Sequence, residues 1–142
     1  MEPRDIALAL ARVRLAIGAT AIAAPGFAGR AMWGREGAGP AARMFGRMLG
    51  GRDIALGLGV VIALDRGAPV RGWLEAGALA DGLDFVSALA ARRELSPSVF
   101  AGTAASAGGA ALAGLWLSRR LHPPPSPDPG SSPEAVVTGH PS

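Results

Sequence analysis

The chain has 142 residues, of which 49% are hydrophobic and 18% are charged, and its formal net charge is +3. This length fits one domain, and a composition rich in Ala and Gly is a poor match to a water-soluble surface. All 14 basic residues are arginines, which lie singly or in pairs beside apolar segments rather than on one face among aromatics. We therefore expect no nucleic-acid partner.

Cysteine is absent, which excludes disulfides, thiolate catalysis and cysteine-ligated metals. The two histidines, His122 and His140, both lie in a proline-rich tail. We expect neither a metal site nor a bound cofactor.

Four apolar segments follow one another along the chain, separated by short breaks rich in Gly, Pro or Arg. None of them alternates with a period of two, and their high alanine content favours helix. The predicted helices span about 5–24, 42–64, 70–92 and 98–118. At about 1.5 Å per residue, each is long enough to cross a hydrocarbon core of roughly 30 Å. We expect an all-α fold, in which residues 1–120 form a four-helix transmembrane bundle with up-down-up-down topology.

Two alternatives stay open. The first three segments contain charges, as the helices of a soluble four-helix bundle would. Such helices carry a continuous polar face, however, and the fourth segment has no charged residue between Glu94 and Arg119. Alternatively, the first segment is a cleaved signal peptide, although Arg12 and Arg14 strain the usual three-part layout. The hydropathy pattern favours a multi-pass protein of the cell membrane.

Residues 121–142 are rich in Pro and Ser and hold too little apolar surface to pack, so they predict a disordered tail. The arginines that flank the four segments are divided equally between the two expected sides of the membrane. The positive-inside rule therefore gives no orientation. The long polar tail favours cytoplasmic termini.

Charged side chains inside the expected spans require partners, because an unpaired Arg or Asp at mid-membrane costs roughly 2.5–3.5 kcal/mol. Helical rise places Asp53 and Asp81 at matching depths of roughly 15–16 Å, and Arg47 and Asp84 nearer one surface at roughly 8–10 Å. The candidate intramembrane polar cluster comprises Arg14, Arg47, Arg52, Asp53, Asp81 and Asp84.

Within this cluster, we expect Arg14 and Arg52 to pair with the two mid-depth aspartates. Arg47 would then meet Asp84. Arg12 would reach Glu75 on the other side of the membrane, or Glu75, about 180° from Asp84 around the helix, would instead extend outward. The charges either lock the register of the helices or mark a path for a proton, an ion or a ligand. Both interpretations stay open.

Small residues at helical spacing predict two strips for close helix packing. The strip on the second segment is Gly46, Gly50 and Gly57, and the strip on the fourth is Gly102, Ser106 and Gly109. Asp53 lies on the same face as the first strip.

Catalytic motifs are absent. No phosphate-binding glycine loop is present, and Ser87 has no histidine within the helical segments to activate it. Asp81 and Asp84 lie three residues apart and are able in principle to act as acid and base. Their arginine neighbours make salt bridges the simpler interpretation, so we do not expect an enzyme.

Several of these features resemble a known group of proteins. They are Pro25-Gly26-Phe27, Trp33-Gly34, the stretch RMLGGRDIALGLG, and the pair Asp81 and Asp84. Over roughly residues 5–117, the chain resembles small four-span bacterial membrane proteins of a domain family of unknown function, similar in layout to DoxX-like membrane proteins. The resemblance implies a helical bundle. DoxX-like proteins are associated with membrane redox complexes and quinones, which implies an accessory or lipophilic-ligand role.

We therefore expect a structural or accessory membrane subunit that binds a lipid or a quinone between its helices. The expected partners are the lipid bilayer and either another membrane protein or further copies of the chain. The alternative is a small transporter or proton-coupled carrier that uses the polar cluster.

Overall fold

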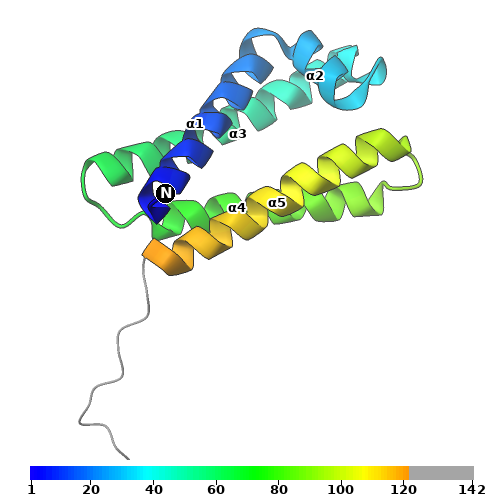
Figure 1. Ribbon diagram of the computed structural model, residues 1–142. Helices are drawn as coiled ribbons and strands as arrows, with labels where there is room; N and C mark the ends of the chain where they lie inside the picture. Colours follow the sequence, from blue (N-terminus) through cyan, green and yellow to red (C-terminus); the bar gives the residue numbers. More distant parts are fainter. Residues whose placement is uncertain (122–142) are drawn as a thin grey trace, which may run out of the picture.

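The computed structural model describes residues 1–121, and every regular element in this part of the chain is a helix (Figure 1). Its elements are α1 (Pro3–Ala23), α2 (Pro25–Trp33), a 3₁₀ turn η1 (Glu36–Ala38), α3 (Pro40–Asp65), α4 (Arg71–Ala90) and α5 (Pro97–Leu121). The predicted all-α fold is confirmed. The predicted disordered tail lies outside the described residues except for Leu121, which still belongs to α5.

The prediction of only four helices was wrong, because α2 and η1 occupy the break after the first segment. Pro25 has no N–H group and cannot continue α1, but its fixed φ suits the first position of a new helix. Ala24, with φ −132° and ψ 58°, forms the corner between α1 and α2. Gly34 then ends α2 with a positive φ of 67°, which a glycine adopts without strain.

The four long helices form two antiparallel hairpins, α1 with α3 and α4 with α5, and most contacts lie within each pair. In the first hairpin, a Cβ on Gly50 would lie 2.7 Å from the carbonyl oxygen of Gly18. One on Gly57 would lie 2.9 Å from the carbonyl oxygen of Ala11. Along these contacts the residue numbers of α1 fall as those of α3 rise, so the two helices are antiparallel. The glycines allow the two backbones to come into contact.

The second hairpin packs in the same way. A Cβ on Gly114 would lie 3.1 Å from the Cβ of Ala78, and Gly108 lies against the ring of Phe85. The two long helices of each hairpin therefore run in opposite directions.

The two hairpins join at one end and diverge toward the other, where α2 lies (Figure 1). The joined end holds the apolar core, in which Leu117 and Ala7 are completely buried. Its other members are Ala11, Val60, Ala63, Val70 and Leu74. Arg4 donates a hydrogen bond of 2.9 Å to the carbonyl oxygen of Leu64, which places the start of α1 beside the end of α3.

Part of the predicted glycine packing was wrong. A side chain at Gly46, Gly102 or Gly109 would meet no other atom within 4 Å. Ser106 is exposed and donates to the carbonyl oxygen of Thr103. The α5 strip fails as a packing surface because α5 turns a different face, that of Gly114, toward α4. On α3, Gly46 lies beyond the closest approach to α1.

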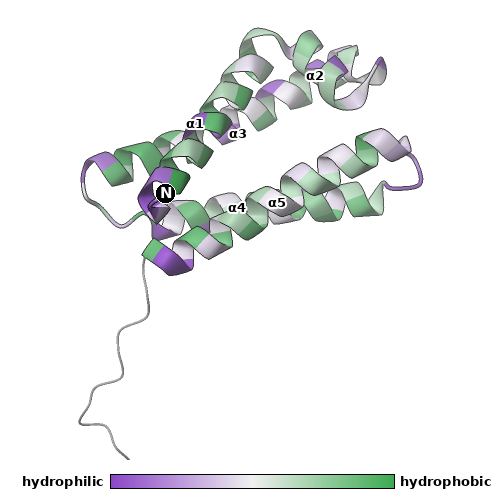
Figure 2. Cartoon of the chain, viewed as in Figure 1, coloured by the Kyte–Doolittle hydropathy of each residue, from purple (hydrophilic) through white to green (hydrophobic). Residues whose placement is uncertain are grey.

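Two of the four long helices, α1 and α5, are long and apolar enough to cross a membrane. The other two carry charged pairs, Arg52 with Asp53 on α3 and Asp81 with Asp84 on α4. Figure 2 shows hydrophilic residues mainly at the turns and helix ends, while long stretches of all four helices are apolar or neutral. Length and composition therefore mark two candidate spans rather than the four that were predicted.

We expect Gly50→Ala to destabilise the protein by about 1–3 kcal/mol, because the added methyl group collides with the backbone of α1. Gly51→Ala is the matched control, since its side chain would meet nothing within 4 Å. This control should be neutral or stabilising by up to about 1 kcal/mol through helix propensity. Unfolding followed by circular dichroism compares the two variants. Equal stabilities would contradict the described packing of α1 on α3.

Candidate functional site

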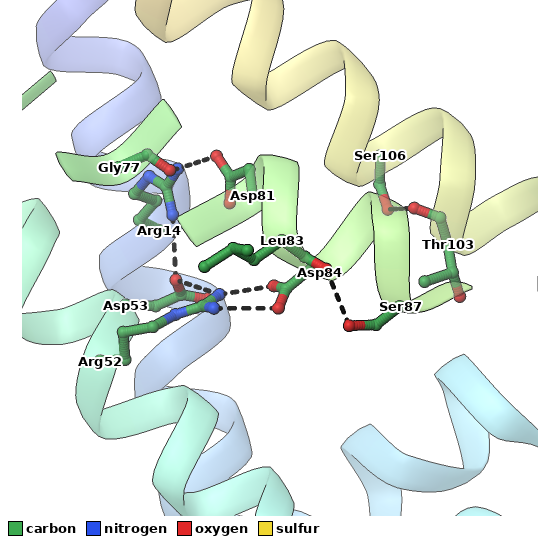
Figure 3. A network of polar contacts seen from close by, with 10 residues as sticks. All are labelled: Arg14, Arg52, Asp53, Gly77, Asp81, Leu83, Asp84, Ser87, Thr103 and Ser106. Atoms are coloured by element: carbon green, nitrogen blue, oxygen red, sulfur yellow. Dashed lines mark hydrogen bonds and ion pairs between the residues drawn. The ribbon is translucent and has the colours of Figure 1, made fainter. Parts of the chain in front are cut away.

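An ion-pair network lies at the middle of the molecule and joins α1, α3 and α4 (Figure 3). At its centre, Arg14 Nη1 donates to Asp53 Oδ1 at 3.0 Å, and Arg14 Nη2 donates to Asp81 Oδ2. The same Nη2 lies 3.5 Å from the carbonyl oxygen of Gly77. One guanidinium group thus binds two carboxylates from two different helices.

Arg52 extends the network toward the diverging end. Its two terminal nitrogens bind both oxygens of Asp84, at 3.1 and 2.8 Å, in the parallel geometry seen in Figure 3. Such a bidentate pair is among the strongest side-chain hydrogen-bonding arrangements. Arg52 Nη2 also lies 3.4 Å from Asp53 Oδ1, which connects the two arginines through one carboxylate.

Helical spacing explains why these side chains converge. Arg14 lies on one face of α1 with Ala7, Ala11 and Gly18, at intervals of four, three and four residues. On α4 the same intervals relate Gly77, Asp81, Asp84 and Ala88. Residues at these intervals share one face of a helix. Each helix therefore presents its charge within a stripe of small residues, which lets the charged groups approach closely.

Of the predicted polar cluster, the structure brings together Arg14, Arg52, Asp53, Asp81 and Asp84. The predicted pairing of Arg47 with Asp84 was wrong, because Arg52 binds that carboxylate and Arg47 is exposed. Matching depth was the basis of that prediction. Five residues separate the two arginines, a rotation of about 140° around the helix, so Arg47 points away from α4.

The predicted pairing of Arg12 with Glu75 was also wrong. Glu75 accepts a hydrogen bond of 2.7 Å from Arg71 Nε, one helical turn earlier on α4. Arg12 is exposed on α1, two residues and therefore more than half a turn from the buried Arg14. A local partner one turn away satisfies the carboxylate of Glu75 without a contact between helices.

The network becomes more open from α1 toward the diverging end. The side chains of Asp81 and Arg14 are 8% and 11% exposed, whereas those of Arg52 and Asp84 are 29% and 37% exposed. These exposed fractions make the Asp84 carboxylate the most accessible acid of the network. Within residues 1–121, Arg52 Nε departs from the trend, since this atom is buried and has no acceptor.

A cavity of about 430 Å³, here called the inner chamber, adjoins the network. All five α-helices contribute to its walls, which include Arg14, Arg52, Asp53, Asp81 and Asp84. Ser87, Thr103 and Ser106 also line it. Ser87 and Ser106 donate to carbonyl oxygens of their own helices (Figure 3).

A second and more open hollow of about 800 Å³, here called the outer chamber, lies between α1, α2 and the first half of α5. Its walls are mainly apolar, with Ile17, Phe27 and Met32 among them. Four wall residues, Ile17, Met32, Thr103 and Ser106, belong to both chambers. The two chambers therefore adjoin, with apolar walls at one end and ionised groups at the other, an arrangement typical of sites for small lipophilic molecules.

Sequence reasoning missed several residues that build this site. Gly18 allows α1 to reach α3, and its position four residues after Arg14 is a signal of that contact. The α2 residues Met32 and Trp33 line the inner chamber, but α2 itself was not predicted. Thr103 carries no sequence signal, because its role depends on how α5 faces the other hairpin.

We expect Arg14→Gln to destabilise the protein by about 3–5 kcal/mol, because it leaves two buried carboxylates without their shared cation. Arg71→Gln breaks the exposed pair with Glu75 and should cost less than about 1 kcal/mol. Adding Asp81→Asn to Arg14→Gln should recover part of the loss, as a double-mutant cycle of unfolding measures. Equal effects of the two arginine substitutions would contradict the central role of Arg14.

No protein-family model, curated protein or solved structure matched this chain. The likeness to DoxX-like membrane proteins accordingly remains a resemblance that depends on the residues in the sequence. The ion-pair network and the two chambers are therefore the features of the described chain that bear on its function.

Proposed function

We propose that this chain is a four-span integral membrane protein that acts as an accessory subunit and holds a lipid-like molecule between its two helical hairpins. The observation that carries this proposal is the inverted distribution of polarity. Ionised side chains gather at the centre, while large apolar side chains face outward.

The outer surface supports a lipid environment. Every long helix carries bulky apolar residues that are more than 40% exposed, for example Ile17, Leu58, Leu79 and Leu112. The buried hydrophobic residues of the described chain are five alanines, two valines and two leucines, with no aromatic residue, Ile or Met among them. A water-soluble protein of this size buries its large apolar residues, since burial of each contributes roughly 1.5–3 kcal/mol. Surrounding lipid removes this requirement.

The character of α5 argues against the soluble alternative. An apolar helix also occurs at the core of soluble proteins, but there it is mostly buried. In α5, only 6% of the apolar 18-residue stretch that could cross a membrane is buried within the protein, and in α1 the corresponding share is 22%. Both helices present their apolar surface outward, which favours lipid as the surrounding medium.

The chambers support a bound lipophilic molecule. Their volumes of about 430 and 800 Å³ lie within the range of typical small-molecule sites. The outer chamber is apolar enough to accept a hydrocarbon or ring system, and the inner chamber offers charged groups and hydroxyl groups to a polar end. We infer that the ligand is amphipathic.

A proton-coupled carrier is the second candidate, favoured by the exposure of Asp84 to a cavity. A carrier requires access to its charges from both sides of the membrane. In the described conformation, the apolar core around Leu74 and Leu117 lies between the network and the joined end. The accessory role therefore agrees better with this conformation.

The absence of cysteine makes the four-span proposal directly testable. Single cysteines at the exposed Ala68 and Glu94 lie in the turns after α3 and α4, at opposite ends of the molecule. With cytoplasmic termini, a membrane-impermeant maleimide added to intact cells should label Glu94→Cys, and label Ala68→Cys only after permeabilisation. Labelling of both from the same side, or recovery of the protein without detergent, would refute the proposal.

Ligand binding between the hairpins is tested by filling the outer chamber. Gly102 lines that chamber and has free space at its Cβ position, so Gly102→Leu should fit while it displaces the ligand. We expect the amount of copurifying lipophilic material, measured by mass spectrometry, to fall roughly tenfold, a loss of about 1.4 kcal/mol. Gly109→Leu, equally unobstructed on the same helix, is the control. Unchanged material in Gly102→Leu would contradict binding in this chamber.

A further inference from the structure

The ion-pair network has unequal numbers of positive and negative groups. Among the residues that line the inner chamber, two arginines, Arg14 and Arg52, face three aspartates, Asp53, Asp81 and Asp84. Their formal charges sum to −1. A net charge is costly in a medium of low dielectric constant, because neither water nor salt screens it.

No other arginine of the described helices supplies the missing positive charge. Arg30 lines the outer chamber but is exposed and forms no ion pair within residues 1–121. Arg12 and Arg47 are likewise exposed and point away from the network. The balancing positive charge is then either a proton on one of the three carboxylates or a cation from outside the network.

Asp84 is the group best placed to receive that charge. Its carboxylate binds Arg52 through both oxygens, yet its side chain remains 37% exposed and lines the inner chamber. Ser87 lies one turn further along α4, and Thr103 and Ser106 line the same chamber from α5 (Figure 3). Carboxylate and hydroxyl oxygens together suit a cationic head group, as acceptors for an ammonium or as a negative surface for a quaternary cation.

The geometry points to a cationic amphiphile as the occupant, with its single positive charge beside Asp84 and its apolar part in the outer chamber. This inference rests on the proposed function and specifies the chemistry of the ligand. A neutral ligand would leave the excess negative charge in place, and an anionic one would add to it. Arg52 Nε, a donor of the network without an acceptor, is covered by protein atoms and offers an anion no contact.

Two probes of the same shape and opposite charge test the inference. Tetraphenylphosphonium is a lipophilic cation, and tetraphenylborate is the anion of nearly identical size. With the full chain in a non-ionic detergent, we expect radiolabelled phosphonium to bind saturably, and the borate to compete at least about tenfold more weakly than unlabelled phosphonium. Equal competition by both ions would overturn the inference.

Asp84→Asn removes the excess charge with little change in shape. It should weaken phosphonium binding about tenfold or more. Glu75→Gln is the matched control on the same helix, since Glu75 pairs with Arg71 and lines neither chamber. Its affinity should equal that of the unaltered chain. Unchanged affinity in folded Asp84→Asn would overturn the inference.

A second pair of variants covers the outcome in which Asp84→Asn fails to fold. Thr103→Lys brings a tethered cation into the inner chamber from α5, and Thr103→Gln brings a neutral side chain of comparable length. The lysine should abolish phosphonium binding, while the glutamine should weaken it only moderately. Equal effects would mean that volume, and not charge, controls binding.

Failure of this inference is distinguishable from failure of the proposed function. If Gly102→Leu displaces copurifying lipophilic material while both probe ions compete equally, the chamber binds ligand without preference for a cation. If Gly102→Leu displaces neither that material nor the phosphonium, binding between the hairpins itself is refuted.

Discussion

The guanidinium group of Arg14 is the contact on which the arrangement of the helices depends. It extends from α1 to Asp53 on α3 and Asp81 on α4, and so connects the two hairpins. Away from the apolar joined end, the hairpins share few other contacts. A buried ion pair is costly to separate, because each partner would be left unsolvated. The network therefore fixes how far the hairpins diverge and how large the space between them is.

Small residues make this central position possible. An arginine side chain reaches two neighbouring helices only where their backbones lie close, and Gly18, Gly50 and Gly77 provide that proximity. The same choice leaves little bulky apolar material to bury, so the large side chains lie on the outside. Close packing around a charged centre and an apolar exterior are thus two consequences of one composition. Both agree with lipid as the surrounding medium.

The sequence was informative where periodicity decides the outcome. Segment length and apolar content predicted the four long helices, and helical rise placed Asp53 and Asp81 at the same level, where Arg14 binds both. Depth alone does not specify the direction of a side chain around its helix. For that reason Arg47 was assigned to a carboxylate that Arg52 binds. The rotation of each helix depends on contacts with all its neighbours, which one helix's sequence does not contain.

The same limit applies to α5 and the chambers. The glycine strip at Gly102 and Gly109 is a genuine periodic pattern, but α5 packs on α4 through Gly114. Nothing within α5 distinguishes these faces, since each carries small residues. The sequence did not reveal the outer chamber either, because it depends on α2, whose nine residues begin at Pro25 in a stretch that was predicted only as a break between helices.

The unequal charges bear on whether the network serves structure alone. A lock between helices works best with matched charges, and Arg14 with Arg52 would be neutralised by two aspartates. The third carboxylate leaves the network with one excess negative charge, and Asp84, although paired with Arg52, is the carboxylate most exposed to a cavity. A chain that retains such a group accepts a cost in stability, and costs of this kind concentrate at functional sites. The excess charge thus favours a network that both holds the hairpins together and receives a ligand.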